Sequence, residues 1–472
     1  MSKERQLFKN TVIVTIGKIC TQLITFFLLP VYTAVLSTEE YGIVDFLNTL
    51  VSLVVPIITL QLEQGVFRYL IEYRDSKENQ RKIISTIVLF LLSQTIIYLV
   101  LFLIASIFIK QQYKVFLATN VIASAFSAIV LQISRGLSDN KTYAKGSFIT
   151  ASTTVILNVI FIVWLKMGVY GMLSATFLGY LCGIIYIIIV KKLYKCVKIR
   201  LFDKVLLKEM LKYSIPLIPN MISWWVVNVS DRTIVTSILG VGMNGILSVA
   251  NKFSNVFSTL YSVFNMTWTE SASINIDADD RDEFFSKILN FIMRFFGSLA
   301  LGMIACMPFA FGFLVNENFN DAYYQIPILI VASMFNILVS FIGSIYVAKK
   351  KTKEIAKTSV LAAVINLTVN LLLIKFIGLF AASISTLLAY FTMFVYRYID
   401  SKKYVNLKFD VRYMVSMIIS FIIVLVSYYL DYLYTNILVL LFIIVYAIYV
   451  NRNNFVLIKN MLISRFEKNK LK

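Results

Sequence analysis

The sequence of 472 residues contains no histidine, and charged residues make up only 15% of it. Soluble proteins carry nearer a quarter of charged residues. Without histidine the chain lacks the commonest metal ligand and the commonest general base near neutral pH. Its four cysteines are scattered along the chain, which indicates neither a disulfide framework nor a metal site. We therefore expect no metal and no cofactor.

Apolar residues, in contrast, are abundant, at 59% of the chain with a mean hydropathy of +0.80. Repeated apolar runs of about 20 residues are long enough to cross roughly 30 Å of hydrocarbon. The predicted fold class is an all-α polytopic membrane protein with about 14 transmembrane helices. We expect these helices at about residues 11–36, 41–66, 83–109, 115–134, 148–165, 169–190, 213–239, 244–269, 288–314, 323–347, 358–375, 379–397, 412–430 and 433–450.

The basic residues gather on one side of the predicted membrane. Of the 45 lysines and arginines, 37 fall in the ends and connections on the side of the N-terminus, four fall on the opposite side, and four lie within helices. This is the positive-inside pattern, and it predicts a multi-pass protein with both termini in the cytoplasm. The net charge of +20 is explained by this orientation in the membrane and does not indicate a nucleic-acid-binding surface, so we expect no nucleic-acid partner.

An internal repeat is visible in the sequence. A shift of 203 residues places "LSTEEYGIVDFLN", which begins at Leu36, on "LGVGMNGILSVAN", which begins at Leu239. A shift of 210 residues places Gly168 on Gly378 within similar helix connections. Parallel repeats of this kind commonly place a substrate path between the two halves. We expect two six-helix lobes of like orientation, followed by two further helices with a basic tail, at residues 1–200, 201–400 and 401–472.

The first two helices of each lobe carry polar side chains at spacings of three and four, which place them on one helix face. The simpler interpretation is that serine, threonine and asparagine bond to neighbouring helices. Ionisable groups at membrane depth, however, almost always face a cavity or a partner. The stripes therefore predict a hydrated, net-cationic cavity between the lobes, suited to a polar anionic substrate. The residues expected to bind substrate there are Lys18, Gln22, Asp45, Asn48, Asn228, Asp231, Arg232, Asn251, Lys252 and Asn255.

Two segments carry a resemblance to a known family. "LSTEEYGIVDFLNTL" and "VSDRTIVTSILGVGMNGILSVANK" resemble the signature regions of Wzx-type polysaccharide flippases, which are polysaccharide biosynthesis proteins of the multidrug/oligosaccharidyl-lipid/polysaccharide exporter superfamily. In that family an Asp-Arg pair precedes a helix that starts Gly-x-Tyr-Ser-x-Ala. Here Asp231, Arg232 and "GILSVA" match the pattern, with Leu247 in place of the tyrosine. The resemblance covers essentially the whole chain.

This resemblance implies a flippase of the bacterial cytoplasmic membrane. Its substrate would be an undecaprenyl-diphosphate-linked oligosaccharide repeat unit, carried across by alternating access for a surface polysaccharide such as a capsule or O-antigen. The implied partners are this lipid-linked substrate, the lipid bilayer, a polysaccharide polymerase and glycosyltransferases. Lys18, Arg232 and Lys252 would hold the diphosphate by charge-assisted hydrogen bonds. Trp224, Trp225 and Trp268 would contact sugar, unless they anchor their helices at the membrane interface.

The depths of two charged residues suggest a gate. Asp45 and Arg232 lie about four and about eight residues inside the outer ends of their helices, so their depths differ by roughly 6 Å. We predict that they pair when the outer side is shut and that substrate phosphate competes for the arginine. The alternative is that Asp231 and Arg232 cap or anchor their helix near the headgroups.

Two other functions are weighed against the flippase. An ion-coupled multidrug or small-molecule antiporter of the same superfamily would need acidic residues in the cavity, and Asp45 and Glu63 are available for this or for carrying a proton or Na⁺. A membrane glycosyltransferase is disfavoured, because "DADDRDE" lies in a short loop and no phosphate-binding lysine loop is present. We therefore expect a transporter and not an enzyme, driven by an ion gradient or by its substrate gradient.

Overall fold

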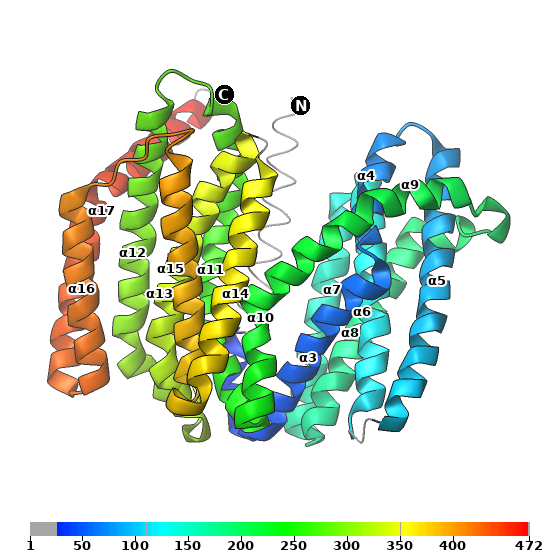
Figure 1. Ribbon diagram of the computed structural model, residues 1–472, viewed down its shortest axis with the longest axis horizontal. Coiled ribbons are helices and arrows are strands. Elements are labelled where there is room, and N and C mark those ends of the chain that lie inside the picture. Colours follow the sequence, from blue (N-terminus) through cyan, green and yellow to red (C-terminus); the bar gives the residue numbers. More distant parts are fainter. Residues whose placement is uncertain (1–25, 109–111, 350, 471–472) are drawn as a thin grey trace. The chain divides into compact units, whose positions relative to one another are not determined.

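The computed structural model describes residues 26–108, 112–349 and 351–470, with the side chains of all these positions except 108, 220, 223, 227, 228, 266, 267, 352 and 453–470. Every regular element in these ranges is a helix (Figure 1). Eleven of the described helices are long and apolar enough to cross a membrane. The predicted fold class, an all-α polytopic membrane protein, is confirmed.

The chain forms two compact units, Met1–Ser248 and Val249–Lys472. The boundary falls within one long helix, α11 (Val241–Asn275). The lobe boundaries expected near residues 200 and 400 stay a prediction.

The first unit is a bundle of long helices joined by short helical turns (Figure 1). Its helices before α11 are α2 (Leu29–Val35), α3 (Thr38–Thr59), α4 (Leu62–Glu72), α5 (Lys77–Phe108), α6 (Lys114–Gly136), α7 (Asn140–Val159), α8 (Gly168–Lys191), α9 (Lys204–Ser214) and α10 (Ile218–Leu239). Short turns follow α7, α8 and α9: η1 (Ile160–Trp164), η2 (Leu193–Lys195), η3 (Ile199–Leu201) and η4 (Ile215–Leu217).

The core of the first unit lies among α4, α5 and α6. Its aliphatic side chains, fully or almost fully buried, include Val66, Leu70, Ile83, Ile87, Val121, Ile129 and Ile133. The outer face of α5 is instead apolar and exposed, as at Ile107. An exposed row of large apolar side chains on a helix of this length is what lipid contact requires.

The second unit contains the rest of α11 and six further long helices. These elements are α12 (Arg281–Leu314), η5 (Glu317–Phe319), α13 (Asp321–Ala348), α14 (Thr352–Ile377), α15 (Phe380–Ser401), α16 (Val411–Leu430) and α17 (Leu433–Lys470). The helix α13 is the most enclosed candidate span of the described chain, with 67% of its apolar window buried.

An extended connector between α15 and α16 is fastened to α12 by a ladder of hydrogen bonds. Asp282, Ser286 and Asn290 stand four residues apart on α12. Their side-chain oxygens accept the backbone N–H groups of Asn406, Lys408 and Asp410 at 3.1, 3.0 and 2.8 Å. Four helical residues rise about 6 Å and two extended residues about 6.6 Å, so the two spacings match.

The expected helices from residue 83 onward correspond to helices of the structure, which adds α9 and continues the last helix to Lys470. The first two expected helices differ more. The first expected helix, 11–36, lies mostly outside the described residues, and only its end appears, as α2. The second, 41–66, is broken, because Leu60 and Gln61 adopt left-handed backbone conformations with φ of 50° and 56°. The sequence turns polar here, with Gln61, Glu63 and Gln64 close together, but it does not indicate that the backbone takes a left-handed turn at Leu60 and Gln61.

Candidate substrate site on helices α3 and α10

Helix α3 begins with a complete capping box. The Glu40 backbone N–H donates to Ser37 Oγ at 3.1 Å, and the Ser37 backbone N–H donates to Glu40 Oε2 at 3.0 Å. Reciprocal bonds of this kind fix the first turn of a helix. The acidic residue of the site, Asp45, lies little more than one turn further along α3, so its position is set by a well-defined helix start.

Asp45 forms an ion pair with Arg232 of α10. Arg232 Nη1 lies 3.1 Å from Asp45 Oδ1, and the two side chains are only 21% and 12% exposed. The other carboxylate oxygen accepts the Asn244 side-chain amide at 3.4 Å, and this amide also donates to the Gly42 carbonyl at 3.1 Å. The two residues therefore pair, as predicted, and the dependence of this pairing on a shut outer side stays a prediction. Its action as a gate stays a prediction.

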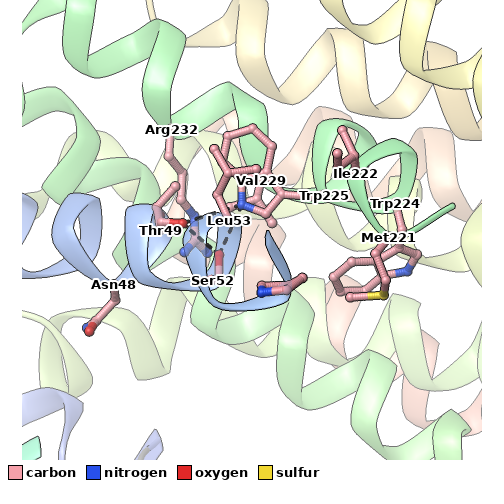
Figure 2. A pocket seen from close by; sticks show the side chains of 11 residues that line it. Asn48, Thr49, Ser52, Leu53, Met221, Ile222, Trp224, Trp225, Val229 and Arg232 are labelled. Carbon is pink, nitrogen blue, oxygen red and sulfur yellow. Dashed lines mark hydrogen bonds between the residues drawn. The ribbon is translucent and has the colours of Figure 1, made fainter. Parts of the chain in front are cut away.

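Beside the ion pair lies a pocket of about 330 Å³ between α3 and α10 (Figure 2). Its lining combines hydrogen-bonding groups, two indole rings, aliphatic side chains and one guanidinium group. The lining residues are Asn48, Thr49, Ser52, Leu53, Pro56, Met221, Ile222, Trp224, Trp225, Val229 and Arg232.

The two tryptophans have different surroundings. Trp225 Nε1 donates to Ser52 Oγ at 3.0 Å and approaches the Thr49 carbonyl oxygen at 3.4 Å, as the dashed lines of Figure 2 mark. Its ring is thereby held against α3. The Trp224 side chain is 57% exposed and lines the same pocket. One indole is therefore held in place within the pocket, and the other is accessible.

A second acidic residue lies at the break between α3 and α4. Glu63 is in the first turn of α4, just beyond the left-handed residues Leu60 and Gln61. Left-handed conformations are uncommon for residues other than glycine, and they gather at functional sites. Within the described part of the chain, Glu63 Oε2 and Thr59 Oγ1 are buried atoms without a hydrogen-bond partner. The break therefore holds a carboxyl group whose bonding capacity is only partly used.

The structure brings together three of the predicted binding residues, Asp45, Asn48 and Arg232, at one place. Asp231 is partly exposed on α10. Two predicted residues, Lys18 and Gln22, and the side chain of Asn228 lie outside the described residues. The remaining ones, which belong to the second unit, are Asn251, Lys252 and Asn255 on α11. Substrate contact by any of these residues stays a prediction.

Several residues of the pocket and ion pair were not among the predicted ones. Thr49, Ser52 and Asn244 belong to the polar stripes that predict the cavity, found by the helical period, although they were not among the residues expected to bind substrate. Met221 and Ile222 carry no comparable signal, because aliphatic residues are as common on lipid-facing surfaces as in pockets. In the described ranges no group of three or more acidic, cysteine or histidine side chains could hold a metal ion.

Comparisons with known proteins relate this geometry to a family. Residues 7–269 match the family described as polysaccharide biosynthesis protein. No curated protein sequence matches the chain at a significant level.

Solved membrane transporters share the fold. The lipid II flippase MurJ, in an inward closed conformation, aligns with a TM-score of 0.69 at 14% identity, over 94% of this chain and all of that one. An inward-facing multidrug transporter of the MATE family and the MOP superfamily aligns with a TM-score of 0.65 at 13% identity, over 80% and 94%. A MATE transporter of Vibrio cholerae gives 0.57 at 14% identity, over 84% and 96%.

Proposed function

Because the chain belongs to the polysaccharide biosynthesis protein family, we propose that it is a flippase for undecaprenyl-diphosphate-linked oligosaccharide repeat units in the bacterial cytoplasmic membrane. It would work by alternating access and supply a surface polysaccharide such as a capsule or O-antigen. The observation that carries this proposal is the position of Arg232, which lines the pocket and at the same time pairs with Asp45.

The chemistry of the pocket supports a substrate that is both sugar-like and anionic. A volume of about 330 Å³ is within the range of small-molecule sites. The exposed ring of Trp224 offers an apolar face to a sugar ring, and the Asn48 side chain offers donors and an acceptor to hydroxyl groups. Arg232 offers the planar fork of donors that suits phosphate oxygens.

Competition for Arg232 would couple binding to opening. In the structure the guanidinium is neutralised by Asp45 at 3.1 Å. A diphosphate carries more negative charge than one carboxylate and can accept a bidentate pair, so it would draw the arginine away. The Asp45 carboxylate would then lose its ionic partner, which weakens the link between α3 and α10 and favours separation of the two helices.

Glu63 is the better placed acidic residue for coupling to an ion. The Asp45 charge is already balanced by Arg232, whereas Glu63 Oε2 has no hydrogen-bond partner in the described part of the chain. We propose that Glu63 takes up a proton or Na⁺ during the transport cycle. The variant E63Q would then transport at a rate that no longer responds to an imposed ion gradient, while keeping its affinity for substrate.

The proposed function can be tested with purified protein in liposomes and a fluorescent undecaprenyl-diphosphate oligosaccharide. We expect R232Q to lower the transport rate at least tenfold and R232K to be intermediate, because an ammonium group cannot bind phosphate with two parallel hydrogen bonds. The variant R81Q, at an exposed position of α5, is the matched control and should transport at the wild-type rate. Export of organic cations, with no effect of the lipid diphosphate, would instead identify an antiporter.

A further inference from the structure

A second pocket, of about 390 Å³, lies in the second unit, where α12, α16 and α17 meet the connector. It shares no lining residue with the candidate substrate site on α3 and α10. Its lining residues, which are mostly charged or aromatic, are Arg294, Asp410, Arg412, Tyr413, Ser416, Tyr449, Val450 and Arg452.

The pocket has an excess of positive charge. Three arginines face a single aspartate, so the lining residues carry a net charge of +2. Arg294 Nη2 pairs with Asp410 Oδ2 at 2.6 Å, which neutralises one arginine. Arg412 and Arg452 take part in none of the ion pairs formed among the described side chains, and both are exposed. The guanidinium of Arg452 lies 5.0 Å from the centre of the Tyr449 ring.

The pocket also retains a buried donor. Arg294 Nε is inaccessible to solvent and finds no acceptor in the part of the chain that the structure describes. A buried guanidinium donor left without an acceptor costs free energy. The arginine is held in place nevertheless, because Asp410 is bound on both sides: its backbone N–H donates to Asn290, and its carboxylate accepts the Tyr413 backbone N–H at 3.3 Å as the cap of α16.

Exposed apolar surface adjoins the pocket on both of its outer helices. On α16 the exposed side chains begin beside Arg412 and continue along the helix, and on α17 they lead up to Arg452. They are Val411, Val415, Ile418, Ile419 and Ile422 on α16, and Leu441, Val445, Ile448 and Tyr449 on α17. A basic pocket at the end of two apolar faces has the arrangement of a lipid site, with a place for a charged headgroup and a surface for acyl chains.

We propose that this pocket binds the phosphate headgroup of an anionic bilayer lipid, with the lipid chains lying along α16 and α17. Arg412 and Arg452 supply the positive charge that no acidic side chain balances among the described residues. The site lies on the side of the membrane that the sequence predicts to be cytoplasmic, where anionic headgroups attract basic residues. It is separate from the proposed transport function and does not depend on it.

The test compares lipid binding to the full-length protein and to the double variant R412Q/R452Q. Native mass spectrometry in a neutral detergent is run with cardiolipin, phosphatidylglycerol, undecaprenyl phosphate and phosphatidylcholine, each titrated separately. We expect one tightly bound phosphate lipid per wild-type chain and weak binding of phosphatidylcholine. The double variant should bind the preferred lipid roughly thirtyfold more weakly, since each basic residue near the surface contributes roughly fivefold.

The matched control is K204Q/K208Q, which removes two exposed charges from α9 in the first unit and should keep the tight lipid. Both double variants should unfold at the wild-type temperature, because none of the four side chains forms an ion pair among the described residues. Which lipid is retained identifies the source of the phosphate. Equal affinity of R412Q/R452Q and wild type, or complete displacement of the lipid by millimolar inorganic phosphate, would overturn the proposal.

Discussion

Gly42 of α3 and Gly245 of α11 meet as equivalent residues, each against the backbone of the other's helix. A Cβ atom on Gly42 would overlap the carbonyl oxygen of Val241, and one on Gly245 would overlap that of Thr38. Each of these carbonyls lies four residues before the opposing glycine. The two glycines are 203 residues apart, which is the shift of the predicted repeat. They therefore occupy equivalent positions in its two copies, and each makes the same contact with the other's helix.

The first prediction concerns this crossing. The variants G42A and G245A should each destabilise the protein by about 2–3 kcal/mol, because a methyl group would force the two helices apart where backbone touches backbone. Thermal unfolding of the purified protein measures the loss. If closure of this crossing is a step of transport, both variants should also slow flipping in liposomes.

A glycine elsewhere provides the control for these variants. Gly302 lies inside α12, and a Cβ atom added to it would have no other atom within 4 Å. The variant G302A should therefore stabilise the protein by roughly 0.5–1 kcal/mol, as expected for alanine in place of glycine within a helix. A loss of stability in G302A similar to that of G42A would contradict the explanation by close backbone contact.

The second prediction concerns the ion pair of Asp45 and Arg232. Removing either charge should cost about 2 kcal/mol, since both side chains are mostly buried and the remaining charge would be left unpaired. The double variant D45N/R232Q should cost less than the sum of the two single variants, by about 1–2 kcal/mol. Chemical unfolding of the four proteins gives this coupling energy, and strict additivity would show that the two groups do not interact.

Transport separates the gate from a purely stabilising pair. We expect D45N to bind the lipid diphosphate more tightly than the wild type, because the competing carboxylate charge is gone, and yet to transport more slowly. Binding can be followed by quenching of tryptophan fluorescence. Unchanged flipping by D45N, assayed as surface polysaccharide in a complemented deletion strain, would remove the gate and leave only the structural role.

The third prediction concerns the indole of Trp225. The variants W225F and S52A remove the same 3.0 Å hydrogen bond from opposite ends, so each should cost about 1 kcal/mol. The double variant should be hardly less stable than W225F alone. Trp224 makes a useful comparison, because its exposed ring can be changed to alanine with little effect on stability. W224A should instead weaken binding of the oligosaccharide.

The fourth prediction is a dependence of stability on pH through Asp139, which caps α7 between two membrane-spanning segments. Burial by itself would raise the pKa of this carboxyl, but hydrogen bonds from Lys191 and Thr142 outweigh it and lower the pKa from 3.8 to about 2. A lowered folded-state pKa means that the stabilisation is complete above the ordinary value and is lost as pH falls toward 2.

The matched variant for this prediction is D139N, which retains a capping side chain but carries no charge. At pH 7 it should be less stable than the wild type by about 1–2 kcal/mol. The difference should narrow as the pH is lowered from 4 to 3, as measured by thermal unfolding in detergent. A difference that stays constant over this range would mean that the ionised form of Asp139 contributes nothing to stability.

Most of the helices were predictable, because a membrane-spanning helix requires a long apolar run that can be recognised in the sequence. The expected spans 169–190, 379–397 and 412–430 correspond to α8, α15 and α16. The break at Leu60 and Gln61 was not predicted, because neither residue is a glycine or a proline that would indicate a left-handed turn. The lobe boundaries expected near residues 200 and 400 stay a prediction, while the boundary between the two compact units lies within the single helix α11.

The candidate site was predictable where charge marks it. Asp45 and Arg232 stand out because ionised groups are costly in hydrocarbon, and their depths along two helices indicated that they could meet. The indole bond to Ser52 and the closeness of Gly42 to Gly245 depend on which faces of the helices meet. The helical period shows which residues share a face of one helix. It does not determine which faces of two helices pack against each other.

The ladder between the connector and α12 restricts how the length of this chain can change. Alternate backbone amides, at Asn406, Lys408 and Asp410, face successive turns of the helix. Deleting one residue between Asn406 and Asp410 would turn the amides on one side of the deletion away from their acceptors, whereas deleting two would keep them facing α12 and lose a single rung. The connector should therefore tolerate the insertion or deletion of an even number of residues better than that of an odd number.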